Sequence, residues 1–204
     1  MEAGAADRPG PGRPPSGARE RVLEAGLEVL KAEGYAGLTT AKVAARAGQN
    51  KALISYHFGS KQGLVAAVGR DMAESITEEV LGGLDGAGTT EEVLRGVLDG
   101  VWRVMDGDWR LARLYLDLAA VSVVEPDVRT VMRAMKEGWR QVLAALLGEV
   151  RDGPSDAGAE AATVWVIAGV EGLMLERLDR GETPALDGAC ELFVRSASAA
   201  VRGA

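Results

Sequence analysis

Apolar residues recur along most of this chain at the three- and four-residue spacing of an amphipathic helix. Leu23, Leu27 and Leu30 mark the buried face of a first helix, which Gly34 is placed to end. No stretch shows the alternation of a strand, so the sequence predicts an all-α protein, with three short helices first and a longer helical bundle after them. Clusters of Gly, Pro and Asp separate the longer helices, whose predicted spans are 61–82, 90–106, 108–122, 127–150, 156–179 and 187–201.

Residues 38–60 carry the pattern of two short helices joined by a tight turn. In the second of them Ile54 and Phe58, four residues apart, are expected to point toward the core. Two helices joined by a glycine turn form a helix-turn-helix. The small and polar residues that bound these helices are Thr39 or Thr40 before the first, Gly48 after it and Asn50 before the second.

The face of the second short helix opposite its core-facing pair has chemistry suited to a DNA major groove. Ala52 and Tyr56 lie on that face, Ser55 flanks them, and Lys51 occupies the exposed first turn. A cation, a hydroxyl, a phenol and a small side chain are groups that can contact base edges or thymine methyls. Lys61 follows at the start of the next helix, where the helix dipole favours phosphate oxygens.

Charge is divided unevenly between this segment and the rest of the chain. The whole protein has a net charge of -7, yet residues 38–70 contain no Asp or Glu. Residues 18–70 sum to +4 and residues 71–204 to -11. A basic part on an acidic body favours a polyanion partner for the basic part alone, although a chance fluctuation of solvated charge would give the same sums.

The stretch LTTAKVAARAGQNKALISYHFGSKQGL resembles the DNA-binding segment of the tetracycline-repressor (TetR) family. The resemblance implies a homodimeric repressor that a small-molecule effector, bound in the C-terminal part, releases from a pseudo-palindromic operator in double-stranded DNA. Carried over by position, phosphate contacts fall on Thr40, Tyr56, His57 and Lys61 and base contacts on Lys51 and Ala52, with Lys42 and Ser55 completing the expected DNA-binding set. Ser55 stands where the family often has Tyr, so the backbone contact common there is expected to be missing or to pass to Tyr56.

His57 is the only histidine and Cys190 the only cysteine, a set too small for a metal site. No G-x-S-x-G or Walker-type glycine loop is present either, so we expect no catalytic residues, no cofactor and no enzyme; His57 could equally do no more than pack. The lone cysteine and the lack of a signal peptide or a long apolar run indicate a cytoplasmic protein without a membrane partner. Residues 1–17, rich in Pro and Gly, are expected to be a disordered tail. Its Arg8 and Arg13 either reach a minor groove or make no contact with DNA.

The acidic C-terminal part contains all four tryptophans and most of the methionines. Such side chains between helices can line an adaptable apolar pocket, here expected to measure about 300 Å³ or more, although the same residues could form ordinary core. An acidic body favours a neutral or cationic effector over an anion. The expected ligand-binding residues are Trp102, Met105, Tyr115, Trp139 and Trp165.

The last two predicted helices are rich in Gly, Ala and Ser, which allows helix backbones to approach closely. The family resemblance implies a dimer interface there, on Val170, Leu173, Phe193 and Val194, although an intramolecular contact would have the same composition. The sequence thus predicts a tail at 1–17, a helix-turn-helix domain at 18–62 and a ligand-binding and dimerisation domain at 63–204. A constitutive DNA-binding protein would be favoured by a fully packed C-terminal domain, and a helical-bundle enzyme by a convergent polar cluster in its pocket.

Overall fold

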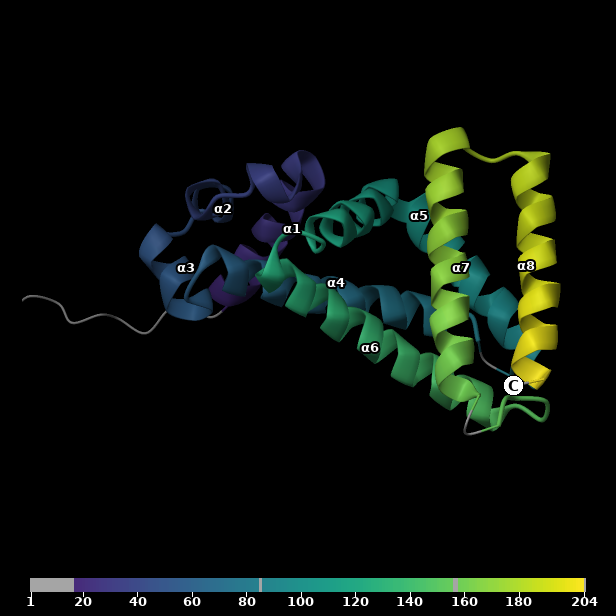
Figure 1. Ribbon diagram of the computed structural model, residues 1–204. Helices are drawn as coiled ribbons and strands as arrows, with labels where there is room; N and C mark the ends of the chain where they lie inside the picture. The colour runs from purple at the N-terminus through teal and green to yellow at the C-terminus, as the bar shows by residue number, and fades with distance from the viewer. Residues whose placement is uncertain (1–16, 85, 156–157, 204) are drawn as a thin grey trace, which may run out of the picture.

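The computed structural model describes residues 17–84, 86–155 and 158–203, and within these ranges the chain forms eight α-helices and no strand (Figure 1). The all-α fold predicted from the sequence is confirmed. Arg8, Arg13 and all but the last residue of the predicted tail lie outside the described residues. The helices are α1 (Ala18–Gly37), α2 (Thr40–Ala47), α3 (Lys51–Phe58), α4 (Lys61–Leu81), α5 (Thr90–Val121), α6 (Pro126–Glu149), α7 (Ala159–Arg180) and α8 (Pro184–Gly203).

Side-chain caps begin the two short helices where the sequence predicted them. Thr39 Oγ1 accepts a hydrogen bond from the backbone N–H three residues on at 3.2 Å, so Thr39 rather than Thr40 caps α2. Asn50 Oδ1 accepts from the backbone N–H two residues on at 2.9 Å and caps α3. Gly48 ends α2 with a φ of 61°, in the left-handed region that glycine adopts without strain. The predicted helix-turn-helix is therefore confirmed.

Two of the long helices contain a kink where the sequence predicted a helix end. Gly34, with a φ of 69°, redirects α1, which continues to Gly37. Asp108, with φ -153° and ψ 90°, is the first residue of the second of two spans that were predicted as separate helices, 90–106 and 108–122. Both spans are segments of the single kinked helix α5. We call residues 109–121, which follow this second kink, the α5 arm.

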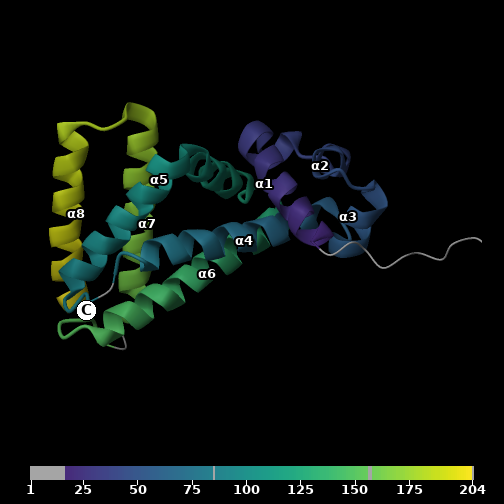
Figure 2. The same cartoon turned by 180° about the vertical axis from the view of Figure 1, so that it is seen from behind.

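The helices α1, α2 and α3 form a head at one end of the molecule, and α7 and α8 stand as an antiparallel pair at the other end (Figures 1 and 2). In both views α4 and α6 run side by side between these ends. We call α4 to α8 the body. One apolar core includes Val22 and Ile54 of the head together with Leu64 of α4 and Met132 of α6, so the head shares a continuous core with part of the body. A second apolar cluster lies within the body, between α5, α6, α7 and α8. No helix of the described ranges has the length and apolar character needed to cross a membrane.

Candidate functional site

The outer face of α3 is exposed above a closed core. Ile54 is 0% exposed, whereas Tyr56 on the opposite side is 74% exposed. Lys51, Ala52 and Ser55 are exposed beside it, as the helical spacing predicted. This short helix therefore presents an ammonium, a hydroxyl and a phenol on one convex surface, in a form that a major groove admits.

Two lysines expected to contact DNA are tied to the end of α1. The Lys42 ammonium donates to a backbone carbonyl in the last turn of α1 at 3.0 Å and is paired with the Glu33 carboxylate. The Lys61 ammonium donates to the Tyr35 carbonyl at 2.9 Å and lies 4.2 Å from the centroid of the Tyr35 ring. A phosphate would have to share both cations with these partners, whereas Lys51 is exposed on α3.

The His57 side chain is half-buried and packs beside two aromatic rings. Its ring centroid lies 5.1 Å from that of Tyr56 and 6.1 Å from that of Phe58. Its Nε2 atom is buried without a hydrogen-bond partner in the part of the chain that the structure describes. In that same part no three His, Cys, Asp or Glu side chains gather as a possible metal site. The geometry favours a packing role for the His57 ring, while Thr40 begins α2 half-buried.

A cavity of about 140 Å³ lies between α4, α5, α6 and α7. It is smaller than the volume of about 300 Å³ expected from the sequence, because valine, leucine and isoleucine side chains from all four helices fill the space around it. A cavity of roughly this size can hold one benzene-sized molecule. Three of the five residues predicted to bind a ligand line it, namely Met105, Tyr115 and Trp139.

The other two residues of that predicted set lie outside the cavity lining. Trp102 packs against the Arg177 guanidinium, whose carbon is 4.9 Å from the ring centroid. Trp165 is 41% exposed on α7, with its ring 6.3 Å from the ring of Phe193. Apolar residues occur all round α7, so the sequence pattern does not tell which face of that helix turns inward.

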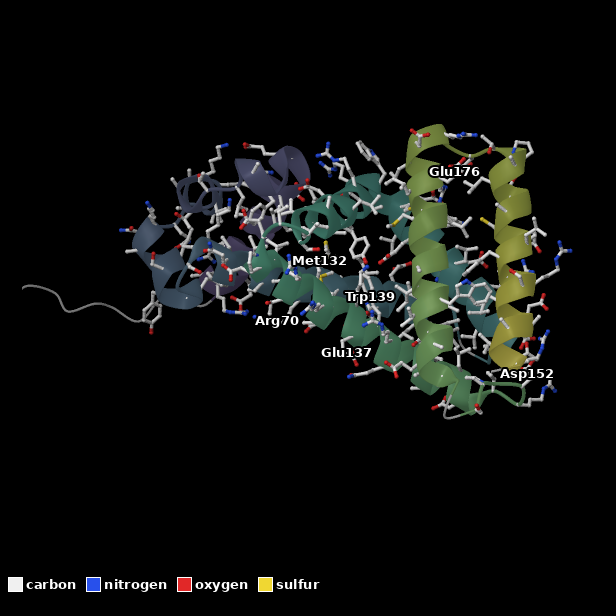
Figure 3. The ribbon with its side chains drawn as sticks, in the orientation of Figure 1. Arg70, Met132, Glu137, Trp139, Asp152 and Glu176 are labelled. Carbon is white, nitrogen blue, oxygen red and sulfur yellow. The ribbon has the colours of Figure 1, made fainter. Side chains whose placement is uncertain are left out.

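Among the described residues, one that lines the cavity has a charged side chain, Glu171 of α7. The Tyr115 hydroxyl donates a hydrogen bond to the Glu171 carboxylate, and Lys136 Nζ lies 2.7 Å from Glu171 Oε1. Trp139, labelled midway along α6 in Figure 3, donates from its indole N–H to Thr77 Oγ1 at 3.1 Å. Burial, together with the neighbouring carboxylate, raises the pKa of Tyr115 well above its usual value, so the phenol remains a neutral donor.

Glu171 was not among the predicted site residues, although the sequence contains a signal for it. It is the single carboxylate in the apolar stretch IAGVEGLML. A lone acid inside such a stretch indicates either a position exposed to solvent or a buried polar contact, and only the packing of α7 against its neighbours decides which.

A group of charged side chains joins the kink of α5 to the head. Lys31, which is 9% exposed, lies with its Nζ 3.0 Å from Asp108 Oδ2 and 2.5 Å from Glu28 Oε1. Burial opposes the charge on Lys31, but these two carboxylates raise its pKa. The Arg110 guanidinium, and then Lys31, hold the pKa of Asp108 well below its usual range. Both partners of the Lys31–Asp108 pair are therefore charged at neutral pH.

The α5 arm continues these contacts along α1. Arg113 donates from its guanidinium to the Lys31 carbonyl at 3.0 Å, and the Asp117 carboxylate accepts from the Tyr35 backbone N–H at 3.0 Å. By helical spacing the opposite face of the arm carries its cavity-lining residues, which are Leu111, Ala112 and Tyr115. One helix therefore contacts the head on one side and the cavity on the other.

Large apolar side chains are exposed on the last two helices, namely Val164, Trp165, Leu175 and Leu192. Among the residues predicted for a dimer interface, Val194 is only 1% exposed and belongs to an apolar core of its own protomer. Val170 lines the cavity, and Leu173 and Phe193 are half-buried against the same core. The exposed set offers a better contact surface than the predicted one.

Comparisons with known proteins agree with this architecture along most of the chain. Residues 22–68 match the family described as "Bacterial regulatory proteins, tetR family", and residues 90–200 match the one described as "BetI-type transcriptional repressor, C-terminal". The HTH-type transcriptional regulator BetI of Escherichia coli strain K12 is 27% identical over 159 residues, which cover 77% of this chain and 80% of BetI.

Solved structures share the fold. A TetR-family transcriptional regulator from Rhodococcus sp. has a TM-score of 0.78 at 20% identity, over 91% of this chain and 99% of that one. A transcriptional regulator from Saccharomonospora viridis, solved in complex with choline, has a TM-score of 0.66 at 20% identity, over 87% of this chain and 94% of that one.

Proposed function

Because this chain belongs to the TetR family of transcriptional regulators, we propose that it is a repressor that binds its operator through α3 and leaves it when a small molecule occupies the cavity of the body. Membership of the family makes the chain a DNA-binding regulator and not an enzyme, in agreement with the sequence-based prediction. The observation that carries the ligand-responsive part of the proposal is the position of the α5 arm between the cavity and the head.

The arm offers a direct mechanical connection. A ligand that widens the cavity presses on the Tyr115 side of the arm, while the side with Arg113 and Asp117 is hydrogen-bonded to α1. Because α1 and α3 share one apolar core, a shift of α1 carries α3 with it. The ligand changes DNA affinity only if it binds the shifted conformer more tightly than the DNA-binding one. A difference of about 1.4 kcal/mol in its binding free energy already changes the ratio of the two conformers tenfold.

The repressor is proposed to act as a homodimer formed through the exposed faces of α7 and α8. Exposed large apolar side chains can mark an interaction surface, and Trp165 and Leu175 of α7 and Leu192 of α8 are exposed here. Ala168 and Gly172, exposed on α7, would let a second copy approach closely. A two-fold dimer presents two α3 helices, so we expect a pseudo-palindromic operator with half-sites about 34 Å apart or a multiple of that spacing.

The alternative of a constitutive, non-sensing DNA-binding protein would be favoured by a fully packed body. The apolar cavity argues against it, because an empty cavity costs stability that a protein without a ligand has no reason to lose. The neighbour solved with choline supports, in general terms, a small-molecule effector for a body of this architecture.

The proposal can be tested with the purified full-length protein and fluorescently labelled DNA from the region upstream of its own gene. We expect anisotropy to report binding, and compounds that quench tryptophan fluorescence to release the DNA over the same concentration range. If compounds that occupy the cavity leave DNA affinity unchanged, the ligand-responsive part of the proposal is wrong. If no specific DNA is retained, the choice of operator region is wrong.

A further inference from the structure

The lining of the cavity contains a carboxylate but no cation among the described residues. Among the described residues that line the cavity, Glu171 is the only Asp, Glu, Lys or Arg. The cations beside it, Lys136 and Arg140 of α6, do not line the cavity. A ligand in the cavity therefore meets a carboxylate in an otherwise apolar and aromatic lining.

The carboxylate is held by two donors that reach the same oxygen. The Tyr115 hydroxyl and Lys136 Nζ both contact Glu171 Oε1. Among the described residues, no hydrogen bond is made to the second oxygen, Oε2. The carboxylate thus retains acceptor capacity that a further donor or cation can use.

Two aromatic rings stand next to this carboxylate. The rings of Tyr115 and Trp139 are paired with their centroids 5.3 Å apart, and Tyr115 reaches Glu171 through its hydroxyl. Lys136 Nζ lies 6.0 Å from the Tyr115 ring centroid, at the outer limit of a cation–π contact. The ammonium of Lys136 therefore already occupies a position that combines a carboxylate with an aromatic face.

We propose that the effector of this protein is a compact organic cation with an apolar surface, and that Lys136 is a built-in competitor that sets its affinity. The inference rests on the proposed function, because it assigns a ligand class to the same cavity. The ligand's positive centre takes over the contact with Glu171, its apolar groups fill the space lined by valine and leucine, and the Lys136 ammonium turns out toward water.

The exchange is feasible because Lys136 is not locked in place. Its side chain is 28% exposed, so its ammonium can regain hydration when the contact is lost, and ion pairs of this exposure are weak. An effector cation that is poorly hydrated loses less on entering the cavity than an ammonium does. The effector cation and the Lys136 ammonium therefore compete for Glu171 with similar free energies. Substitution of Lys136 should shift this competition in favour of the effector.

An anion is the opposite case and is disfavoured by the same geometry. It would have to separate Lys136 from Glu171 and then lie beside that carboxylate. Arg140 is the other cation near Tyr115, but its Nη1 already donates to Glu137 at 3.3 Å. Its Nε is buried without a hydrogen-bond partner in the described ranges, which makes an acidic ligand held by Arg140 and Lys136 the alternative to exclude.

The experiment uses three probes of similar size that differ in charge: phenyltrimethylammonium, its neutral isostere tert-butylbenzene, and benzoate. Binding to the full-length protein is measured by tryptophan quenching and by calorimetry. We expect the cation to bind roughly tenfold more tightly than the isostere, since a cation–π contact and a carboxylate both favour it. Lys136→Met should raise the affinity for the cation about tenfold further, with little change for the isostere, because the competitor is gone.

Two variants keep the test interpretable. Glu171→Gln preserves shape and removes the charge, so it should reduce the preference for the cation to the part that the aromatic rings supply, even if Lys136→Met folds poorly. Arg133→Met removes an exposed cation from the same helix without touching Glu171 and should behave as the wild type. Equal binding of cation and isostere in the wild type, or tighter binding of benzoate that Lys136→Met destroys, would overturn the inference.

DNA release is scored separately from binding. If the charge preference appears and no probe alters operator affinity, the ligand class stands and the repressor-release mechanism falls. If neutral compounds that occupy the cavity release DNA as well as cations do, the release mechanism stands and the assignment of Glu171 and Lys136 falls.

Discussion

The head and the body place their functional groups in opposite ways. In the head, Ile54 closes the core while Lys51 and Tyr56 stand on the outer surface. In the body, Tyr115 is 3% exposed and its hydroxyl serves a cavity that four helices enclose. A helix that acts on its surface can be interpreted from its own periodicity, whereas a cavity belongs to no single helix.

The two regions also differ in charge, and their junction combines both signs. The segment from 18 to 70 is basic and the remainder is acidic. Between them lies the partly buried group of Lys31, Glu28 and Asp108, in which each charge has a partner of opposite sign. The junction is therefore held by specific contacts, and four predictions test the contrast in order of decreasing effect.

The largest effect should come from Leu192→Glu on α8. Leu192 is 61% exposed, so the substitution leaves the protomer core intact but places a charge in the proposed dimer interface, where desolvation penalises it. We expect monomers by light scattering and a loss of operator affinity of about a hundredfold or more, since two linked heads bind far more tightly than one. Val124→Glu, at an apolar position between α5 and α6 that is 75% exposed, is the control and should remain dimeric. A wild-type monomer at micromolar concentration would contradict the dimer.

The next effect concerns the outer face of α3. Lys51→Ala should cost about 1 to 3 kcal/mol per half-site and relax sequence preference, because an exposed lysine there is placed to contact bases. Lys61→Ala should weaken all DNA sequences alike and reduce the salt slope by about 0.9 per phosphate contact. Titrations of matched and scrambled operators at several salt concentrations separate the two. Unchanged affinity and slope in both variants would show that this face does not contact DNA.

A smaller effect is expected at the junction. Lys31→Met removes the cation from a largely buried group and should lower the free energy of unfolding by about 2 kcal/mol, measured by urea denaturation. A second variant, Asp108→Asn, tests the same ion pair through the pH dependence of the free energy of unfolding. The pKa of Asp108 is depressed in the folded protein, so its contribution is present above about pH 4, the ordinary aspartate pKa, and declines as the pH falls below it. The stability difference between wild type and Asp108→Asn should therefore shrink in acid; a difference that is constant with pH would exclude the ion pair as its source.

The smallest effect on stability is expected from substitution of the tryptophans, which tests whether the ligand binds in the cavity. Trp139 lines the cavity and Trp165 does not. Trp139→Phe should therefore remove most of the quenching by a bound cation at a cost of about 1 kcal/mol in stability for the lost Thr77 hydrogen bond. Trp165→Phe should leave the quenching intact. Quenching that persists in Trp139→Phe and vanishes in Trp165→Phe would relocate the ligand to the exposed face of α7.

The helices, the caps and the exposed face of α3 could all be predicted from the sequence, because each depends on residues close together in the chain. Thr39, Gly48 and Asn50 act within one turn, and Ile54 identifies the inner face of its helix by spacing alone. The sequence also marks the position of the kink at Asp108 with a short stretch of Asp and Gly, although α5 continues through this stretch.

The cavity and the dimer surface could be predicted only in part. Glu171 and Lys136 are 35 positions apart, and their contact depends on how α6 packs on α7. The tryptophans illustrate the same limit. Trp139 has charged neighbours in the sequence and Trp165 has apolar ones, yet Trp139 lines the cavity and Trp165 is 41% exposed. Val194 was expected in a dimer interface, whereas it is buried in an apolar core of its own protomer.

The continuous core described for the head and the body has a thermodynamic consequence. Since Ile54 of α3 and Met132 of α6 belong to one packed cluster, neither region retains a complete apolar interior when the other melts. Heating should therefore give a single cooperative calorimetric transition, not one for each region. Amide hydrogens of α3 should exchange more slowly when the distant cavity is filled, since any ligand that stabilises the folded state stabilises all of this cluster together.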